Sequence, residues 1–594
     1  MRRLRLFAPT FYPALIVGIL LLFLLIRANV VLSHFPDFLS EWSTAAQFWV
    51  FCAAVVLITL GLGLTHTVNL HISKKTQSDL LILAGIALFA LVLRLLFLED
   101  AVHIFVHDEF WFTEGVNRFQ RDPYTPLLQP FMDPAPYIGI FPFMQLLSVE
   151  IFGATLSALR LPSVLLGTGT VVVTYLLTQQ LFSRRAAIIA ALFLAAFPPH
   201  IHFSRLGLNN IADPFFGALA LTCLARGLLH EGQAANKLLF AIGGSALGMT
   251  LYFYDAGKFI FTPLVLGWLL CLFAAKRLRR QHITPLLIFG AAALLVSLPM
   301  VYTTAARGFS VSARMEQMTW GLRYLTEDIY NIPAITPLEV VTTYVERYIF
   351  PVLAHYVYSL DSEPYFYGGY TAMLLPPFAL LFLGAVGYFL WNWRDARSQL
   401  ILLWLLLTTL GISLIYPATW TIRYPVVFPA LALMIGVLCE RIIARFPRVR
   451  RPLWVLLGLL IFSQPVYYFA FHLPLYNAQI RPQADYVDAM YRAAQFPRRA
   501  QVYFITDDWV DVPRTWTLKD FWSLDVEVFY QPTMSEAELN ALPRDVDLIL
   551  FINQDDTEMQ QVIQRVFTTA QPLLSPYDIP LDKQYLMFYI AAEQ

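Results

Sequence analysis

The stretch 157-SALRLPSVLLGTGTVVVTYLLTQQLFSRRAAIIAALFLAAFPPHIHFSR-205 contains two long apolar runs, 159–182 and 186–201, separated by the basic pair Arg184 and Arg185. A run of about 20 apolar residues is long enough to cross the hydrocarbon core of a bilayer as a helix. Basic residues between two such runs are typical of the cytoplasmic side of a membrane. The stretch therefore predicts two membrane-spanning helices joined on the cytoplasmic side.

The rest of the chain repeats this pattern. Of its 594 residues, 58% are hydrophobic and only 14% are charged, a composition that excludes a soluble globular protein of this length. The formal net charge of zero argues against general nucleic-acid binding. We predict an all-α polytopic membrane protein with about thirteen transmembrane helices. The expected spans are 9–26, 46–64, 80–98, 159–182, 186–201, 211–229, 238–254, 257–275, 284–304, 372–391, 399–416, 424–442 and 452–471.

Basic residues test this count, because they gather on the cytoplasmic side of membrane proteins. With these spans, every basic cluster falls on the cytoplasmic side, provided that segment 137–153 does not cross. That segment is short and contains Glu150, so we expect a juxtamembrane or re-entrant helix on the outer side. We also expect an uncleaved first helix, because no small-residue cleavage site follows Arg5. The clusters are Arg2/Arg3/Arg5, Lys74/Lys75, Arg184/Arg185, Lys276/Arg277/Arg279/Arg280, Arg394/Arg397 and Arg441/Arg445/Arg448/Arg450/Arg451.

The tail after residue 472 differs from the membrane part, because its polarity is mixed and short alternating strands recur in it. Strands are expected at 501–506, 526–531, 547–553 and 585–592, with helices near 482–494 and 556–569. This pattern predicts a small C-terminal α/β domain on the extracytoplasmic side. The expected domains are residues 1–78 (two helices), 79–475 (the membrane catalytic domain, with outer loops 99–158 and 305–371) and 476–594.

Two adjacent carboxylates, Asp108 and Glu109, follow the third expected span directly, with His107 beside them and a short amphipathic helix behind them. Ionisable groups near membrane depth are costly, and they often mark functional sites. The alternative interpretation is that Asp108 caps the helix and that Glu109 is an ordinary first-turn charge.

Four further outer segments carry polar side chains, and each has a structural alternative. Two alternating histidines without a third ligand are weak evidence for a metal. Acidic and basic residues three positions apart can form a surface pair. An arginine at the end of a span, such as Arg423, can extend its side chain to the membrane interface. The aromatic residues of the loop 305–371 can form a belt at that interface. The segments are the loop with His200, His202, Arg205, Asn209, Asn210 and Asp213, the turn with Asp255 and Lys258, the helix mouth at Arg423, and the loop 305–371, which has an amphipathic segment near 337–353, His355 and several tyrosines.

Several of these stretches together resemble a known family, the GT-C polyprenyl-phosphate-sugar glycosyltransferases of the family 39 and 83 type. This family includes the protein O-mannosyltransferases and the lipid A aminoarabinose transferases. The resemblance covers roughly residues 80–440, and its most specific part runs from Arg160 to Ala186. It is carried by 94-RLLFLED-100, the loop with Asp108 and Glu109, the stretch 157–205, and 422-IRYPVVFPALALMIG-436.

The resemblance implies an enzyme that moves a sugar from a polyprenyl phosphate to an acceptor on the outer face, with inversion. It implies that Asp108 is the general base and that Glu109 is a second catalytic carboxylate that orients the acceptor. It also implies cations at the donor phosphate, with Arg423 in the family's position and Arg205 and Lys258 as further candidates. The expected substrate-binding residues are His107, His202, Asn209, Asn210, Asp213, Asp255 and Tyr424.

The chain departs from the family's pattern in three places. Two extra helices, 9–26 and 46–64, precede the usual first helix, and Arg205 and Asp213 are separated by an unusual spacing. Asp133 stands where the family has a lysine, which favours a different sugar. No cofactor or resident metal is predicted, although a divalent metal is left open.

The expected partners are a polyprenyl-phosphate-linked donor, the bilayer, and an extracytoplasmic protein, lipid or glycan acceptor. The expected location is a bacterial plasma membrane. A competing interpretation is a transporter or flippase of a polyprenyl-linked glycan. Transporters place charged groups near the bilayer midplane and often contain repeats. Here the polar groups lie in outer loops and no repeat is visible in the sequence, which argues against transport. The acidic pair argues against a polysaccharide polymerase or ligase.

Overall fold

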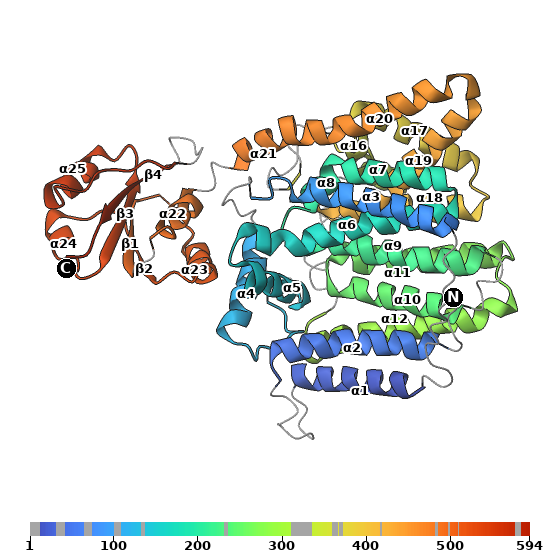
Figure 1. The fold of residues 1–594 in the computed structure, drawn as a ribbon, viewed down its shortest axis with the longest axis horizontal. Coiled ribbons are helices and arrows are strands. Elements are labelled where there is room, and N and C mark those ends of the chain that lie inside the picture. The colour runs from blue at the N-terminus through green and yellow to red at the C-terminus, as the bar shows by residue number, and fades with distance from the viewer. Residues whose placement is uncertain are drawn as a thin grey trace.

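The computed structural model describes residues 12–30, 42–64, 74–99, 108–131, 137–230, 236–310, 336–358, 366–367, 372–415, 418–480, 485–496, 499–508, 510–576 and 584–593. Within these ranges the chain forms a large bundle of helices whose axes run in roughly the same direction, with a small α/β domain at one end (Figure 1). The predicted fold class is confirmed, and the predicted residues His107 and Asp133 lie outside the described ranges.

The helices of the bundle follow one another along most of the chain. They are α1 (Tyr12–Asn29), α2 (Thr44–Gly63), α3 (Lys74–Leu95), α6 (Leu156–Leu181), α7 (Arg184–Ala196), α8 (Pro198–Phe203), η2 (Asn209–Ile211), α9 (Ala212–Leu229), α10 (Lys237–Met249), η4 (Thr250–Tyr252), α11 (Asp255–Ala274), η5 (Arg280–His282), α12 (Ile283–Ala306), α17 (Pro376–Trp391), α18 (Ala396–Ser413), η7 (Thr421–Arg423), η8 (Pro425–Val427), α19 (Phe428–Arg445), η9 (Pro447–Val449), α20 (Arg450–Tyr467), η10 (Tyr468–His472) and α21 (Leu473–Ile480).

Several helices begin where a hydroxyl side chain satisfies a backbone donor that the helix leaves without a partner. The hydroxyl of Thr155 accepts a hydrogen bond from the Ala158 N–H, and the hydroxyl of Ser183 accepts one from the Ala186 N–H. Such caps stabilise a helix start by about 1 kcal/mol. The basic pair Arg184 and Arg185 therefore forms the first turn of α7, directly after the turn that separates it from α6.

Ten helices in the described ranges are long and apolar enough to cross a membrane. Three further expected spans correspond to shorter helices, namely α7, α10 and α17, which run beside the long ones (Figure 1). Their shortness has local causes. Helix α7 ends at Ala196, two residues before Pro198. Helix α10 continues into the 3-10 turn η4, and α17 begins only at Pro376. The predicted number of spans was therefore right only if these shorter helices are counted.

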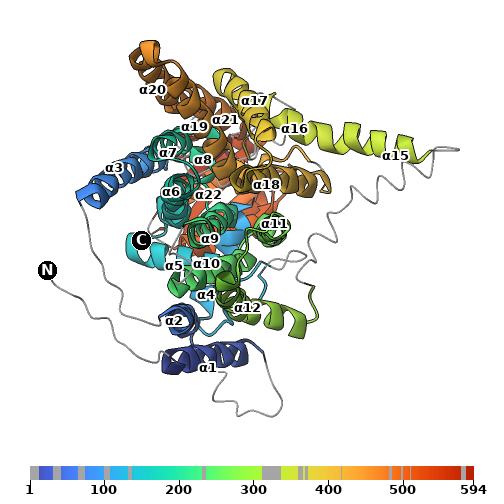
Figure 2. The same cartoon turned by 90° about the vertical axis from the view of Figure 1, so that its right-hand side faces the viewer.

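Two short helices, α4 (Glu109–Arg121) and α5 (Ile140–Phe152), lie at the end of the bundle that faces the α/β domain (Figure 1). Helix α5 has 13 residues, as α7 and α10 do, but it lies with α4 at the end of the bundle and does not run beside the long helices (Figure 1). It corresponds to the segment that we expected to stay on one side of the membrane. A third element, α15 (Pro337–Tyr344), η6 (Val345–Ile349) and α16 (Phe350–Val357), projects sideways from the bundle (Figure 2).

The N-terminal hairpin α1–α2 is tied to the segment between α4 and α5 by buried amides. The side-chain oxygen of Asn29 accepts the Leu128 N–H at 2.7 Å, and that of Gln47 accepts the Leu127 N–H at 2.9 Å. Asn29 and Gln47 also bond to each other at 3.0 Å. The two helices that precede the family's usual first span are therefore part of the framework around α4.

The C-terminal domain is a four-stranded sheet in the order β2-β1-β3-β4, in which only the β3–β4 pair is antiparallel. Its strands begin at or within one residue of the predicted positions. One face of the sheet shares the apolar core of the bundle, whereas the other face packs against α25 in a core of its own. The elements are α22 (Asp485–Ala493), β1 (Ala500–Ile505), α23 (Val512–Phe521), β2 (Val526–Gln531), α24 (Glu536–Asn540), β3 (Asp547–Asn553), α25 (Thr557–Val566) and β4 (Tyr585–Ile590).

Candidate functional site

Asp108 occupies the N-cap position of α4, but its carboxylate makes no capping hydrogen bond to the helix. The alternative that this carboxylate serves only as a cap is therefore not what the structure shows. Asp108 is half-buried and acts electrostatically on the phenol of Tyr254, which lies just before α11. The carboxylate therefore lies near enough to Tyr254, the residue before Asp255, to raise the pKa of its phenol.

Glu109, the next residue, is fully buried in a two-pronged ion pair. Its two carboxylate oxygens accept hydrogen bonds from Nε and Nη2 of Arg160, each at 2.8 Å, and the Gly207 N–H donates to Oε1 at 2.6 Å. Arg160 also donates to the Leu98 carbonyl at 3.2 Å. Glu109 therefore joins α4 to α6 through Arg160, which in turn holds Leu98 beyond α3. It also joins α4 to Gly207, in the segment after α8. This geometry suits a residue that holds Asp108 in place, and the predicted contact of Glu109 with the acceptor stays a prediction.

Asp213, at the start of α9, holds the beginning of α11. Its two carboxylate oxygens accept the backbone N–H groups of Tyr254 at 3.1 Å and of Gly257 at 2.5 Å. A Cβ atom at position 257 would overlap this carboxylate, so glycine is needed for the close approach. Asp213 thereby fixes the turn that presents Asp255, and its own carboxylate is engaged with backbone donors.

Asp255 and Lys258 form a buried ion pair on the first turn of α11, with the Lys258 ammonium 3.0 Å from Oδ1 of Asp255. They are three residues apart, as an ordinary surface pair would be, but both side chains are at least nine-tenths buried. A buried pair of this kind carries a desolvation cost that a surface pair does not.

Arg423 lies in the turn between α18 and α19, and its side chain is 4% exposed. One guanidinium nitrogen donates to the Ile415 carbonyl at 3.2 Å, and the guanidinium lies over the Trp420 ring with its carbon 5.2 Å from the centroid. It also forms a side-chain hydrogen bond with Tyr254. Burial lowers the pKa of Arg423, and the neighbouring phenols of Tyr254 and Tyr424 oppose this shift.

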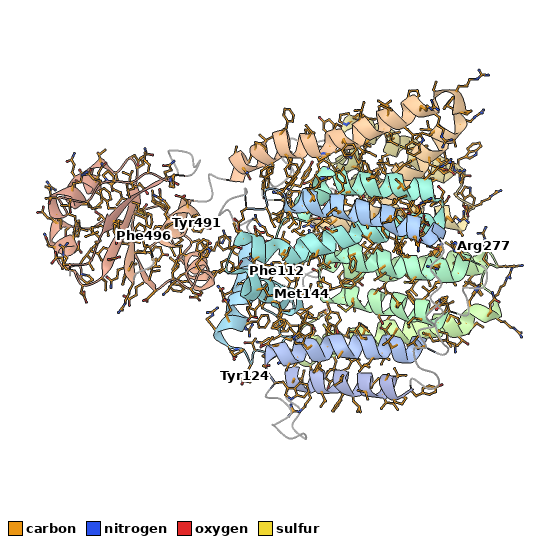
Figure 3. All side chains as sticks on the ribbon, viewed as in Figure 1. Phe112, Tyr124, Met144, Arg277, Tyr491 and Phe496 are labelled. Atoms are coloured by element: carbon orange, nitrogen blue, oxygen red, sulfur yellow. The ribbon has the colours of Figure 1, made fainter. Side chains whose placement is uncertain are left out.

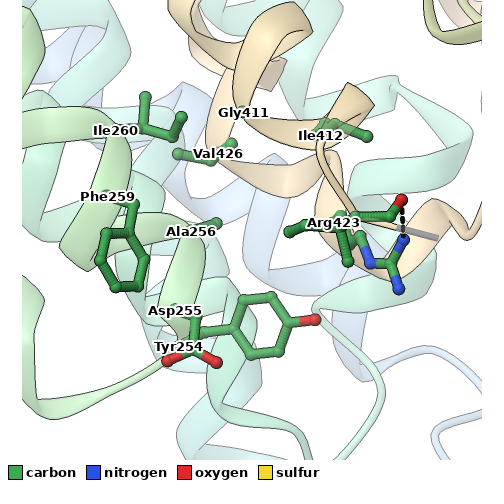
Figure 4. A pocket seen from close by; sticks show the side chains of 10 residues that line it. Tyr254, Asp255, Ala256, Phe259, Ile260, Gly411, Ile412, Arg423 and Val426 are labelled. Atoms are coloured by element: carbon green, nitrogen blue, oxygen red, sulfur yellow. Dashed lines mark hydrogen bonds between the residues drawn. The ribbon is translucent and has the colours of Figure 1, made fainter. Parts of the chain in front are cut away.

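A mostly apolar pocket opens between α11 and α18, and Arg423 and Asp255 are its charged lining residues (Figure 4). In Figure 4 the phenol of Tyr254 points toward the Arg423 guanidinium. The other lining residues supply apolar surface: Ala256, Phe259, Ile260, Gly411, Ile412, Ile415 and Val426. The pocket can therefore hold an apolar chain whose anionic end meets the guanidinium.

Tyr254 is the residue around which the charged groups gather. Burial raises the pKa of its phenol, Arg423 opposes this shift, and the carboxylates of Asp255, Asp108 and Asp213 add to it. These four charged residues come from α4, α9, α11 and the turn before α19. The structure therefore brings together most of the charged residues that the sequence singled out. Tyr254 itself was missed, although it stands next to Asp255 in 252-YFYDAGKFI-260.

Arg205 and His202 lie in a different cluster. Arg205 donates to the carbonyls of Leu96 and Phe97, just beyond α3, and its guanidinium carbon lies 5.2 Å from the centre of the Phe469 ring. His202 is buried with Nδ1 3.2 Å from the Tyr468 hydroxyl, and burial lowers the pKa of its imidazole. Neither side chain lines the pocket beside Arg423, and their predicted contacts with the donor phosphate and the substrate stay predictions.

Asn209, Asn210 and Tyr424 are buried as parts of the framework. The Asn210 amide donates to the Ile422 carbonyl at 3.1 Å, which ties the start of α9 to the turn that carries Arg423. The Tyr424 hydroxyl donates to the Ala418 carbonyl at 2.9 Å. Asn209 is 4% exposed within the turn η2. These residues shape the site, and their predicted contact with substrate stays a prediction.

Among the described residues, no group of three or more His, Cys, Asp or Glu side chains is arranged to hold a metal ion. The cysteines Cys52, Cys223, Cys271 and Cys439 are free thiols. Of the charged groups at the site, the Arg423 guanidinium can bind an anion and the Asp108 carboxylate can accept a proton.

Comparisons with known proteins give two kinds of likeness. Residues 139–303 match the family model described as dolichyl-phosphate-mannose-protein mannosyltransferase. ArnT from Cupriavidus metallidurans bound to undecaprenyl phosphate is structurally similar, with a TM-score of 0.50 and 14% identity, over 87% of this chain and 100% of that chain. The Archaeoglobus fulgidus oligosaccharyltransferase in the apo form has a TM-score of 0.46 and 13% identity, over 86% and 76% respectively. None of the curated proteins compared with this chain matches it.

Proposed function

We propose that this chain, which has the fold of the GT-C glycosyltransferases, transfers a monosaccharide from a polyprenyl phosphate to an acceptor on the extracytoplasmic face, with inversion. The observation that carries the proposal is that Tyr254 and the buried Arg423 line one apolar pocket, while the carboxylate of Asp108 lies near enough to act electrostatically on the same tyrosine. A catalytic base and an anion site beside an apolar pocket are what such a reaction needs.

Arg423 binds the donor phosphate in this proposal. A guanidinium forms two parallel hydrogen bonds with phosphate oxygens, and its charge offsets the negative charge that builds up as the sugar leaves. The apolar pocket between α11 and α18 accommodates the first part of the polyprenyl chain. ArnT, whose fold this chain shares, is bound to undecaprenyl phosphate, which supports a polyprenyl phosphate as the carrier here. Lys258 stays a further candidate for the phosphate, because its partner Asp255 lines the same pocket as Arg423.

Asp108 acts as the general base. Its carboxylate takes the proton from the acceptor's nucleophilic group as that group forms a bond to the anomeric carbon. The bond between that carbon and the phosphate oxygen breaks at the same time, and its electron pair leaves with the polyprenyl phosphate. Attack from the side opposite the phosphate inverts the configuration. Glu109 and Arg160 hold the start of α4, and therefore Asp108, in position.

The distribution of charge along the bundle supports the extracytoplasmic location of the site. Figure 3 places the basic residue Arg277 at the end of the bundle opposite Phe112 of α4 and Tyr491 of the C-terminal domain. Because basic residues favour the cytoplasmic side, the candidate site and the C-terminal domain are assigned to the extracytoplasmic side of a plasma membrane. The acceptor is assigned to the same side, where a protein, lipid or glycan can reach Asp108.

The test is sugar transfer from radiolabelled polyprenyl-phosphate sugars by the purified chain in vesicles, with and without a metal chelator. Asp108→Asn is expected to lower the transfer rate by about 10²-fold or more, because general bases contribute about that much. Glu150→Gln is the matched control, because Glu150 is an exposed carboxylate at the end of α5. Full activity of Asp108→Asn, or no transfer from any donor by the unaltered chain, would contradict the proposal. Loss of activity with chelator would overturn the expectation that no metal is needed.

A further inference from the structure

The helical element α15–η6–α16 lies across the direction of the bundle. Figure 2 shows the bundle helices almost end-on, whereas this element is seen from its side as it projects away from them. Its 21 residues, 337–357, form a continuous helix with one wider π turn in the middle. If the bundle crosses the membrane, this helix runs along the plane of the membrane.

One side of this helix is anchored to the ends of two bundle helices. The Tyr344 hydroxyl is 2.8 Å from the Ser413 hydroxyl at the end of α18. The Tyr356 carbonyl accepts the Leu374 N–H at 3.0 Å, two residues before α17 begins. The helix is therefore fixed at the level where α17 and α18 meet the surface of the membrane.

A second side of the helix is apolar and is not covered by the protein. Five large apolar side chains, each between 43% and 72% exposed, recur at steps of three, four, five and three residues. The step of five spans the π turn, in which one extra residue completes the turn. The extra residue keeps the two later side chains on the same face as the three earlier ones. These five residues, called the apolar face below, are Leu338, Val341, Val345, Phe350 and Leu353.

The remaining side of the helix is polar. Glu339, Glu346 and Arg347 are exposed, and Glu339 forms a capping box with Thr336 at the start of the helix. A helix with an apolar face, a polar face and an axis parallel to the bilayer is typical of elements embedded in the membrane interface. An exposed apolar stripe of this size requires a partner.

The neighbouring spans indicate that this partner is lipid. On α18, Leu410 and Leu406 are exposed one and two turns, respectively, before Ser413, which bonds to Tyr344. On α17, Leu380 and Leu383 are exposed. The apolar face of the sideways helix thus adjoins a surface that faces the acyl chains of a bilayer. We propose that α15–η6–α16 is embedded in the membrane interface beside the candidate site, with its apolar face in the acyl-chain region of that leaflet.

This placement links the lipid surface to the turn that carries Arg423. His355, on the anchored side of α16, lies with its ring centre 5.1 Å from that of Tyr424. Tyr356 contacts the same tyrosine edge-to-face, with ring centres 5.7 Å apart. A helix that rests in the interface therefore sets the depth of Arg423 in the membrane, in addition to the support that the bundle gives.

The test uses fluorescence quenching of the full chain in phosphatidylcholine vesicles whose acyl chains carry bromine. A bimane fluorophore is attached to Val341→Cys or Phe350→Cys, in a background where the four native cysteines are replaced by alanine. Glu346→Cys is the matched control, since Glu346 is exposed on the polar side of the same helix. All three substitutions remove exposed side chains and leave the anchored side intact. No substrate is present, so the result is independent of the transferase proposal.

Fluorophores at positions 341 and 350 are expected to lose most of their emission in brominated vesicles, compared with unbrominated ones, while the fluorophore at 346 keeps most of its emission. Equal quenching at all three positions would overturn the proposal, because it would show no preferred face. Absence of quenching at 341 and 350 would overturn it as well, because water or another protein surface would then cover the apolar face.

Discussion

At the residue scale, the two adjacent carboxylates of the candidate site have different surroundings and therefore different roles. Asp108 faces the charged groups around Tyr254, whereas Glu109 is enclosed with Arg160. The sequence shows the pair side by side, but it does not show which of the two carboxylates turns inward. That direction depends on Arg160, which lies on another helix, and on the Gly207 N–H.

Glu109→Gln tests this division of tasks. Removing one partner of a buried ion pair leaves the other charge uncompensated and costs about 3–5 kcal/mol. The variant is expected to lower both the thermal denaturation temperature and the transfer rate. Asp108→Asn, in contrast, is expected to lower the transfer rate alone. The measurement is thermal unfolding of both variants in detergent, beside their transfer rates. Unchanged stability of Glu109→Gln together with lost transfer would instead assign Glu109 a direct role in the reaction.

Arg423→Lys tests the donor site. Lysine keeps the positive charge but cannot form the two parallel hydrogen bonds of a guanidinium. We expect kcat/KM for the donor to fall by about 10²-fold or more, the usual effect of removing one group that stabilises developing charge. Arg121→Lys, a change of an exposed arginine on α4, is the control. Donor kinetics that match those of the unaltered chain would show that the phosphate binds elsewhere.

Two of the predicted site residues, Asp255 and Arg423, line one pocket in the structure, and the position of each in the chain already sets its direction. Asp255 follows a turn and begins α11, and Arg423 stands in a tight turn between two spans, so both point toward the end of the bundle. Arg205 and His202 come from the α8 turn, whose orientation depends on packing against Phe469 and Tyr468. These contacts join segments far apart in the sequence, so no local pattern indicates them.

At the element scale, the sequence predicted the strands of the C-terminal domain well, because short apolar runs between polar segments are typical of strands that are buried on both faces, as β1 and β3 are. The side-by-side residues Val502 and Tyr503 belong to different cores, as the alternation of side chains along a strand requires. The sideways helix was expected only as an amphipathic segment near 337–353. Its π turn could not be predicted, since the extra residue is visible only once the apolar positions are placed on a helix.

Helix α4 carries Asp108 at one end and meets the C-terminal domain along its length. The Asn117 amide donates to the Thr517 carbonyl of α23 at 2.8 Å in a buried position. Asn117→Ala is expected to weaken this contact by about 1–3 kcal/mol, since it leaves a buried carbonyl without its donor. Backbone hydrogen exchange in α4 and α23 should then be faster than in the unaltered chain. Gln120→Ala, on the exposed side of α4, is the control, and equal exchange in both variants would show that Asn117 does not hold the contact.

At the scale of the whole molecule, the distribution of charge predicts which end faces the cytoplasm. A cysteine introduced at Glu558, at the start of α25, is expected to react with a membrane-impermeant maleimide in intact cells. A cysteine introduced at Arg277 is expected to react only after the membrane is permeabilised. Both variants are made in a background without native cysteines. Labelling in the opposite pattern would place the C-terminal domain in the cytoplasm.

The two extra N-terminal helices show what the sequence could not reveal about the molecule as a whole. They were expected as an addition to the family's core, and no pattern indicated that Asn29 and Gln47 support the segment after α4. The same holds for the C-terminal domain, one face of which joins the core of the bundle. The first contact depends on single buried amides, and the second depends on two apolar faces that match. One sequence does not show which residues pair in such contacts.

The distance along the chain between Asp108 and Arg423 has a consequence for how the protein is made. More than half of the chain is synthesised between these two residues, and the turn that carries Arg423 is held by the Asn210 bond to Ile422. When Asp108 has been inserted during synthesis, Arg423 has therefore not yet been made, and only one half of the site exists. Under the proposed mechanism, an unfinished or truncated chain has no place to hold a lipid phosphate opposite its carboxylate, so it would not consume the carrier lipid before the last spans are inserted.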